Sequence, residues 1–160
     1  MIKMENDFIF NLGSLKIVQI GYIYRDIKKQ IEIMKALYGF PEFVIIENKD
    51  RFCKYRGRDS KYSTIIAISR IFNTQIELIQ WIEGECIFKE FIDRGREGLH
   101  HFGILVEDVE SYISEFKQKG IDVMHAGQMG KLKTTYFDTE KTFGIYLEFQ
   151  QIIKRKRKKS

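Results

Sequence analysis

Long apolar runs are missing from this sequence of 160 residues. One of the longest, which runs from Ser63 to Ser69, is far shorter than the roughly 20 residues that a helix needs to cross a bilayer. The first seven residues carry charges of both signs and no apolar core, so they do not resemble a secretory signal. We therefore expect a cytoplasmic protein.

Cysteine is also scarce. Cys53 and Cys86 are the two cysteines of the chain, and they form no metal or redox motif. Two thiols in an intracellular protein of this size are usually unpaired, so we expect no disulfide.

The sequence lacks an excess of basic charge over its body, although the formal net charge is +5. Six of the 27 basic residues lie in the run from Lys154 to Lys159, and the remaining 21 face 22 acidic residues. Charge confined to one terminus does not indicate a surface that binds nucleic acid. We therefore expect neither nucleic acid nor a membrane as partner, and interpret residues 152–160 as a solvated basic tail.

Two segments of the chain resemble each other. Residues 17–27 align without a gap with residues 99–109, and each segment is strand-like up to an aspartate, where the apolar spacing becomes that of a helix. The aspartates are well placed as N-caps, and a glycine ends each expected helix. The matched pairs are Gly21 with Gly103 and Asp26 with Asp108, and Gly39 and Gly120 end the two expected helices.

Strand-like segments follow both expected helices, so each half of the chain has the pattern βαβββ. The expected strands cover residues 42–47, 62–72, 74–81, 121–126, 131–138 and 142–151, and a short helix over 85–93 links the halves. We expect an α+β fold in which duplicated βαβββ modules, about 15–81 and 98–151, form a cupped mixed sheet. One domain would then cover residues 15–151 behind an N-terminal extension of residues 1–14.

Four polar residues lie in strands where burial is expected. They are Gln19, Glu77, His101 and Glu148. A buried carboxylate must meet a cation, take a proton or reach solvent, because desolvation of the unpaired charge is costly. Two carboxylates, an imidazole and an amide oxygen on equivalent strands can converge on one divalent metal ion. The sequence therefore predicts a metal site inside the cupped sheet.

A simpler interpretation is that these strands have one wet face, which would explain a single glutamate between aliphatic neighbours. The pairing of all four residues by the repeat favours the metal site instead. The glycine two positions after Gln19 and after His101 would leave room for a ligand on the same face. His100 is expected to point away from His101 as a structural residue, and His125 is expected at the surface.

Three motifs in these positions resemble the vicinal oxygen chelate superfamily over about residues 15–151. They are Glu97 to His101 (EGLHH), Val106 to Val109 (VEDV) and Gly144 to Glu148 (GIYLE). Members include glyoxalase I, methylmalonyl-CoA epimerase, extradiol dioxygenases and bleomycin-resistance-like proteins. The resemblance implies a small-molecule substrate and a homodimer.

Within that superfamily the ligand types distinguish the members. A Gln, Glu, His, Glu set resembles that of eukaryotic-type glyoxalase I, whereas epimerases usually have histidine at the position of Gln19. Epimerases also carry an acidic proton-transfer residue in the strand that matches residues 65–67, which are apolar here. Extradiol dioxygenases need two histidines and a carboxylate. We therefore expect a glyoxalase I-type lyase or isomerase, with an acyl-CoA epimerase and a non-catalytic binding or resistance protein as alternatives.

The chemistry implied is proton transfer next to a carbonyl. A divalent ion, with zinc or nickel favoured and cobalt or manganese possible, would make the C–H next to a bound carbonyl more acidic and stabilise the resulting enediolate. By the resemblance, Glu148 is the expected catalytic base and Glu77 its counterpart, while Gln19 and His101 would be ligands only. The substrate would be an α-hydroxycarbonyl, a thiohemiacetal or an acyl thioester.

Two further segments carry weaker signals. Residues 51–61 are basic and contain a glycine, and we interpret them as a solvated loop. Residues 127–131 lack the spacing of a phosphate-binding loop and are expected to form a hairpin turn.

Overall fold

The computed structural model describes residues 11–155 as eight strands and four α-helices, preceded by a short 3-10 helix. Residues 1–10 of the expected N-terminal extension and residues 156–160 of the expected basic tail lie outside the described part of the chain. The helices are η1 (Leu12–Ser14), α1 (Ile27–Tyr38), α2 (Ile87–Asp93), α3 (Val109–Gln118) and α4 (Glu140–Phe143). The strands are β1 (Ile17–Ile23), β2 (Val44–Tyr55), β3 (Arg58–Ile71), β4 (Thr74–Gly84), β5 (Gly98–Leu105), β6 (Val123–Met129), β7 (Leu132–Phe137) and β8 (Tyr146–Ile152).

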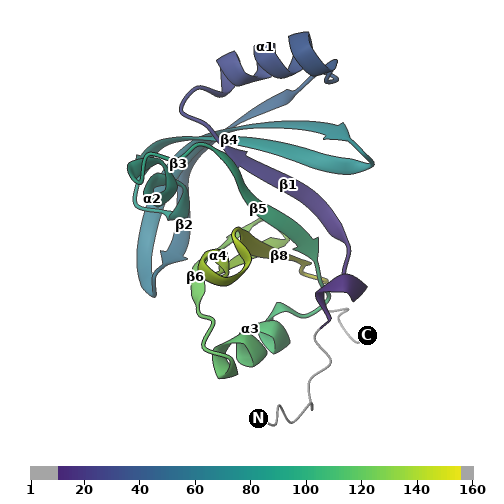
Figure 1. Ribbon diagram of the computed structural model, residues 1–160. Coiled ribbons are helices and arrows are strands. Elements are labelled where there is room, and N and C mark those ends of the chain that lie inside the picture. The colour runs from purple at the N-terminus through teal and green to yellow at the C-terminus, as the bar shows by residue number, and fades with distance from the viewer. Residues whose placement is uncertain (1–10, 156–160) are drawn as a thin grey trace.

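The strands form one mixed sheet that closes into a barrel in the order β1-β4-β3-β2-β6-β7-β8-β5 (Figure 1). The α+β class and the mixed sheet are confirmed, whereas the expected cup is closed. Closure comes from β1 paired with β5 on one side and from a short contact between β2 and β6 on the other. The β1–β4 and β5–β8 pairs are parallel, and all other pairs are antiparallel.

Both long helices lie on the outside of the barrel and begin and end as the sequence predicts. The Asp26 side chain accepts a hydrogen bond from the Lys29 N–H at the start of α1, and the Asp108 side chain accepts one from the Glu110 N–H in α3. Gly39 ends α1 with a φ of 64°, a left-handed conformation that favours glycine. The apolar sides of α1 and α3 pack against opposite parts of the sheet, so the barrel's inner face is left for other side chains.

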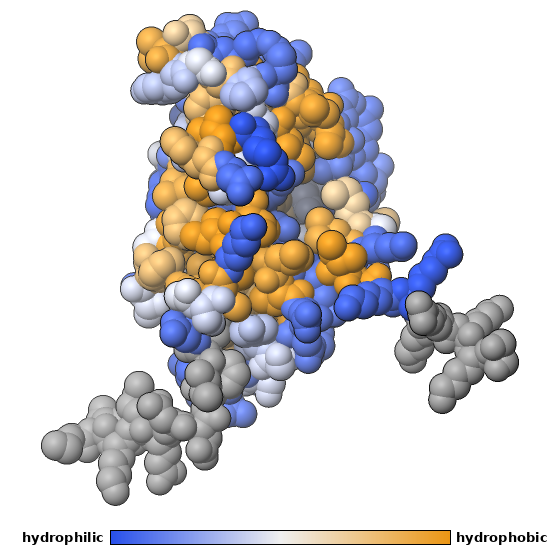
Figure 2. All heavy atoms as spheres, turned by 90° about the vertical axis from the view of Figure 1, so that its right-hand side faces the viewer, coloured by the Kyte–Doolittle hydropathy of each residue, from blue (hydrophilic) through white to orange (hydrophobic). Residues whose placement is uncertain are grey.

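Apolar side chains are exposed along α1 and the first part of β2. The side chains are Leu37, Tyr38, Val44, Ile45 and Ile46. Figure 2 shows apolar side chains gathered over the middle of the face that forms the right-hand side of Figure 1. Between residues 44 and 52, β2 pairs with β3 alone, because its contact with β6 covers only residues 53–55. The described structure therefore has an open strand edge there, which is apolar at its start, from Val44 to Ile46.

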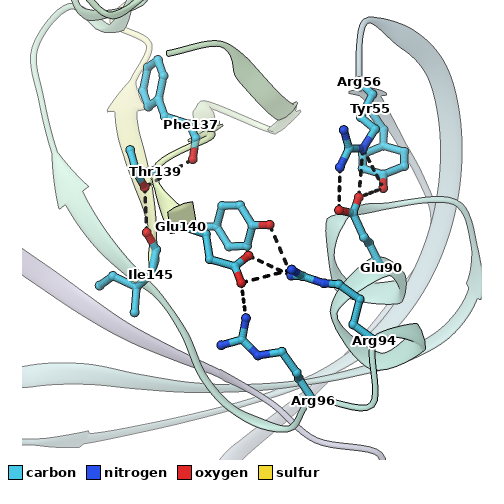
Figure 3. A network of polar contacts seen from close by, with 10 residues as sticks. Tyr55, Arg56, Glu90, Arg94, Arg96, Phe137, Thr139, Glu140 and Ile145 are labelled. Carbon is cyan, nitrogen blue, oxygen red and sulfur yellow. Dashed lines mark hydrogen bonds and ion pairs between the residues drawn. The ribbon is translucent and has the colours of Figure 1, made fainter. Parts of the chain in front are cut away.

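The α2 helix fills one end of the barrel, where Phe88 and Phe91 join the internal apolar cluster. Ion pairs hold this helix and the turn after it (Figure 3). Glu90 of α2 accepts two hydrogen bonds from Arg56, at 2.6 and 2.9 Å, and a further one from Tyr55. Beyond the helix, Arg94 donates to both carboxylate oxygens of Glu140 at 2.8 and 3.1 Å, and Arg96 donates to the same carboxylate.

The predicted loop over residues 51–61 is wrong. This segment contains the end of β2, a tight turn at Arg56 and Gly57, and the start of β3. The hydrophobic pattern did not extend over it because charged residues surround the few apolar ones, although Cys53 and Tyr55 continue the inner face. The short α4 helix also includes residues 142 and 143, which were expected to begin a strand.

None of the helices within residues 11–155 is long and apolar enough to cross a membrane. Cys53 and Cys86 are both buried and unpaired, as expected.

Candidate functional site

The pairing of the two central strands brings the predicted ligands together inside the barrel. In the antiparallel β1–β5 pair, Gln19 lies opposite Gly103 and Gly21 lies opposite His101. The parallel neighbours then place Glu77 of β4 beside Gly21 and Glu148 of β8 beside Gly103. Gly21 thus lies between Glu77 and His101, which are on the strands on either side of it. In the same way, Gly103 lies between Gln19 and Glu148.

Both glycines are required by this close approach. A Cβ atom at Gly21 would lie 1.9 Å from the Cε1 atom of His101. A Cβ atom at Gly103 would lie 2.8 Å from both the Gln19 Cβ and the Gln150 Nε2. These glycines were expected to leave room for a ligand on the same face, and the space beside Gly21 is occupied by the ring of His101.

The predicted ligand atoms surround one ring nitrogen. His101 Nε2 lies 3.2 Å from Gln19 Oε1, 3.3 Å from Glu77 Oε2 and 3.2 Å from Glu148 Oε2. Glu77, His101 and Glu148 form a buried group whose ligand atoms all lie within 4.8 Å of one another, so it could hold a metal ion. Oxygen and nitrogen ligands about 2.0–2.1 Å from a tetrahedral ion lie about 3.3 Å apart, so the distances from His101 Nε2 to the three oxygen atoms suit a divalent metal.

The electrostatics of the group also favour a bound cation. Burial raises the pKa of Glu148, and the Glu77 carboxylate raises it further, while His101 opposes the shift. Burial alone would lower the pKa of His101, but the Glu148 and Glu77 carboxylates raise it overall. Two buried carboxylates this close repel each other, so a positive charge between them, carried by a metal ion or by a protonated His101, stabilises the group.

Two glutamines that the sequence analysis did not single out orient Gln19. The Gln19 Nε2 donates to Gln75 Oε1 at 2.6 Å, which leaves its Oε1 directed at the ring of His101. The Gln150 Nε2 donates to Glu148 Oε1 at 2.6 Å and to Gln19 Oε1 at 3.1 Å. Gln150 lies two residues after Glu148, and the period of two along a strand could have identified it.

Tyr136 is a second residue that the sequence analysis missed. It lies opposite Glu148 in the β7–β8 pair, is buried, and hydrogen-bonds the Glu148 side chain. Burial raises the pKa of the Tyr136 hydroxyl well above its usual value, and the nearby Glu148 and Glu77 carboxylates add to this. Tyr136 therefore stays protonated as a donor to Glu148. Only the strand pairing, which the sequence does not give, brings it to the site.

The expectation that His100 points away from His101 is wrong. Across β1, Gly21 pairs with His101 and the next residue, Tyr22, pairs with Leu99, so His100 is the extra residue of a β-bulge. Both neighbouring histidines are consequently buried inside the barrel, with their Nδ1 atoms 3.0 Å apart. Burial and the neighbouring His101 lower the pKa of His100 well below its usual value, which keeps the ring neutral.

His125 was expected at the surface and is buried instead. Its ring lies 5.3 Å from the Tyr62 ring, 5.6 Å from Phe88 and 5.5 Å from Tyr136, measured between centroids. Burial lowers the pKa of His125 to about 4. The bulge-like register shift between Val123 and His125 in the β6–β7 pair directs the ring inward, and local sequence does not reveal this shift.

A cavity leads from the donor group to the open edge of β2. Its inner end is lined by Gln19, Glu77 and Glu148, and its outer part by Asn48, Arg51 and Gln128. The carboxylates of the donor group therefore line the same cavity as residues of β2 and of the β6–β7 turn.

Comparisons with known proteins agree on the fold. Residues 18–137 match the sequence model of the Glyoxalase/Bleomycin resistance protein/Dioxygenase superfamily. No curated protein matches the sequence. A hypothetical protein from Bacillus halodurans has a similar structure, with 20% identity, a TM-score of 0.63, and coverage of 92% of this chain and 99% of that chain.

Methylmalonyl-CoA epimerases are also among the similar structures. A variant of the Streptomyces coelicolor enzyme in complex with 2-nitronate-propionyl-CoA is 17% identical, with a TM-score of 0.59 and coverage of 88% of this chain and 99% of that chain. The Mycobacterium tuberculosis enzyme is 13% identical, with a TM-score of 0.58 and coverage of 86% and 88%. At these identities the likeness concerns the fold.

Proposed function

The chain belongs to the Glyoxalase/Bleomycin resistance protein/Dioxygenase superfamily, and we propose that it is a metal-dependent lyase or isomerase of the glyoxalase I type. The observation that carries this proposal is the arrangement of three oxygen atoms, from Gln19, Glu77 and Glu148, within 3.2–3.3 Å of His101 Nε2. We assign these four residues as the ligands of one divalent ion. Zinc and nickel suit the mixed oxygen and imidazole donors, as do cobalt and manganese.

The ion would supply Lewis-acid stabilisation of negative charge on a substrate carbonyl oxygen. The protein's own residues would bind, orient and move the proton. Glu148 is the proposed base by the resemblance to glyoxalase I, and its buried side chain lines the cavity beside the other donors. Gln150 and Tyr136 hold the Glu148 carboxylate in place, and Glu77 faces it across the His101 ring.

Exchange of the substrate proton with solvent tests the assignment of the base. The zinc- or nickel-loaded protein would be incubated in deuterium oxide with the hemithioacetal of methylglyoxal and glutathione, and deuterium incorporation followed by NMR. We expect Glu148→Gln to retain some metal and to slow exchange by roughly 100-fold or more. The control Glu110→Gln, on an exposed helix position, should exchange as fast as wild type. A wild-type rate in Glu148→Gln would refute the role of this residue as base.

An acyl-CoA epimerase is the second candidate, since structures titled methylmalonyl-CoA epimerase share the fold. The β3 strand argues against it. By the family resemblance, an acidic proton-transfer residue is expected near residues 65–67, but Ile66 lines the cavity at this level. The same exchange assay with methylmalonyl-CoA separates the two candidates, because only an epimerase should exchange the proton of that thioester.

A non-catalytic binding protein of the same fold is the remaining alternative. Metal analysis of protein purified without chelators distinguishes it from an enzyme. About one equivalent of a transition metal per chain would support the enzyme, and an empty site of low affinity would favour the binding protein.

We further propose that the protein forms a homodimer through the open edge of β2. This edge is apolar at Val44, Ile45 and Ile46, and an unpaired, exposed strand edge is a template for another strand. Ile45→Lys should shift sedimentation to the monomer. Phe72→Lys, at the exposed β3–β4 turn, is the matched control and should leave the oligomeric state unchanged. A monomeric wild type would contradict this interface.

The two-module organisation also remains a proposal. It is supported by the symmetric β1–β5 register, in which Gln19 faces Gly103 and Gly21 faces His101. We propose a single domain over residues 15–151, built from modules of about 15–81 and 98–151.

A further inference from the structure

Arg51 is the only lysine, arginine or histidine among the residues that line the cavity leading to the donor group. It lies in the outer part of that cavity, with Asn48 on the same strand and Gln128 on β6 across the opening. Since the inner end carries the Glu77 and Glu148 carboxylates, the cavity has acidic and basic ends.

A bulge in β2 turns Arg51 into this cavity. Arg51 follows Asn48 by three positions along β2, but their partners on β3, Tyr62 and Thr64, are only two positions apart. The extra residue reverses the alternation, so Asn48 and Arg51 face the same side of the strand. Asp50 accommodates the bulge with a φ of 52°, and its N–H donates to Ser63 Oγ at 3.1 Å.

The guanidinium of Arg51 makes no hydrogen bond or ion pair within residues 11–155. By contrast, Arg56, Arg94 and Arg96 each hold a glutamate (Figure 3). Arg51 is also only partly exposed. An unpaired guanidinium in a cavity offers a planar, five-donor site that matches a carboxylate or phosphate.

A second polar group in the same cavity also has no partner. Thr64 is 2% exposed, lines the cavity, and its Oγ1 atom has no hydrogen-bond partner. A buried hydroxyl without a partner is unfavourable, so this group is either solvated by water or satisfied by a ligand. Thr64 pairs with Asn48 across the β2–β3 ladder, which places the hydroxyl next to the part of β2 that carries Arg51.

We propose that Arg51 and Thr64 form an anion subsite, with Asn48 and Gln128 as further donors. The inference rests on the proposed function and deepens it: the substrate carries a carboxylate or phosphate group besides the oxygen atoms that approach the donor group. The guanidinium attracts this anionic group to the outer part of the cavity, while the other end of the substrate approaches the donor group. The subsite therefore also sets the direction in which the substrate enters.

A matched pair of ligands tests the subsite in the zinc-loaded protein. Succinic acid monohydroxamate and butyrohydroxamate carry the same chelating hydroxamate and chains of equal length, but only the first ends in a carboxylate. We expect wild type to bind the first more tightly by roughly tenfold or more, as for a hydrogen-bonded ion pair. Arg51→Gln should remove this preference and leave the affinity for butyrohydroxamate unchanged. The control Arg58→Gln, on the exposed part of the same hairpin, should keep the preference.

Two further measurements identify the preferred anion and test the anion subsite separately from the proposed metal-dependent function. The phosphonate analogue of the succinate ligand shows whether a phosphate is preferred to a carboxylate. In metal-free protein, inorganic phosphate should cause NMR shifts at Thr64 that Arg51→Gln abolishes. An equal affinity of wild type for both hydroxamates, or a preference that survives in Arg51→Gln, would overturn the subsite, as would phosphate binding that does not depend on Arg51. If phosphate binds through Arg51 but neither hydroxamate binds, the subsite stands and the metal-dependent function fails.

Discussion

The Nδ1 atoms of His100 and His101 lie 3.0 Å apart inside the barrel, although the two residues are neighbours in one strand. The β-bulge at His100 creates this contact. One of the two nitrogen atoms must carry the hydrogen. If His101 Nε2 offers its lone pair to a metal ion, the His101 Nδ1–H donates and the His100 Nδ1 accepts. Under the proposed function, His100 thus fixes the tautomer that His101 needs as a ligand.

Loss of this acceptor should weaken metal binding. We expect His100→Phe, which keeps the size and aromatic packing of the ring, to lower zinc affinity by about 10- to 100-fold, as is typical for the hydrogen-bond partner of a metal-ligating histidine. Competition with a chromophoric chelator measures the affinity. His125→Phe is the matched control, since it changes a buried histidine of the same cluster that does not contact His101. Equal affinities in the two variants would show that His100 does not position the ligand.

Gly21→Ala should displace the His101 ring, because the added Cβ would lie 1.9 Å from Cε1 of that ring. We expect both a loss of zinc affinity and a loss of stability of about 1–3 kcal/mol, the usual cost of overpacking. Gly127→Ala is the control, since its Cβ would lie 3.4 Å from the nearest atom, Phe52 O, an ordinary contact. Chelator competition and urea unfolding report the two effects. Retention of wild-type affinity in Gly21→Ala would contradict the proposed role of the ring.

His125 should make the protein sensitive to acid. Burial lowers the pKa of His125 to about 4, whereas an unfolded histidine takes up its proton near pH 6.5. Between these values the unfolded chain binds more protons, so stability is fully present above pH 6.5 and falls as the pH drops to 4. The loss from this residue is about 3 kcal/mol.

The variant His125→Phe isolates that contribution. It keeps the other two histidines of the chain, so subtracting its free energy of unfolding from that of wild type removes their effect. We expect this difference to change by about 3 kcal/mol between pH 6.5 and pH 4, measured by urea unfolding at several pH values. A constant difference over that range would show that His125 is protonated alike in the folded and unfolded chain.

Glu140 should contribute to stability through its two arginine partners (Figure 3). Its side chain is 15% exposed, and Arg94 binds it through two hydrogen bonds. We expect Glu140→Gln to lower the free energy of unfolding by about 1–3 kcal/mol, as for other charge-assisted hydrogen bonds. Glu110→Gln breaks an ion pair with Lys133 at a carboxylate that is 66% exposed, and should cost at most about 1 kcal/mol. Similar losses in the free energy of unfolding of both variants would show that the Glu140 network stabilises the protein no more than an exposed ion pair.

Several features of the fold could be predicted from the sequence because local signals carry them. Asp26 and Asp108 cap their helices, Gly39 ends α1, and the apolar period changes at the predicted places. The same holds for the donor group, since Glu77, His101 and Glu148 stand out as polar residues within apolar strands.

Other features depend on strand register, which local sequence does not determine. The bulges at Asp50 and His100 reverse which side chains face inward, so Arg51 was assigned to a solvated loop and His100 to the opposite face. Tyr136 reaches Glu148 only through the β7–β8 pairing. Sequence reasoning therefore missed the residues that bulges and pairing between distant strands bring into the site, whereas Gln150 could have been identified from the period of two along β8.

Under the proposed function, one divalent ion binds between Gln19, Glu77, His101 and Glu148. Equilibrium dialysis of the purified protein against zinc and nickel, with the bound metal quantified, tests it most directly. We predict one ion per chain in wild type, and an affinity reduced by at least about 100-fold in the double variant Glu77→Gln, Glu148→Gln, which remains folded because two repelling carboxylates are removed. No bound ion in wild type, or equal binding by the double variant, would contradict the account.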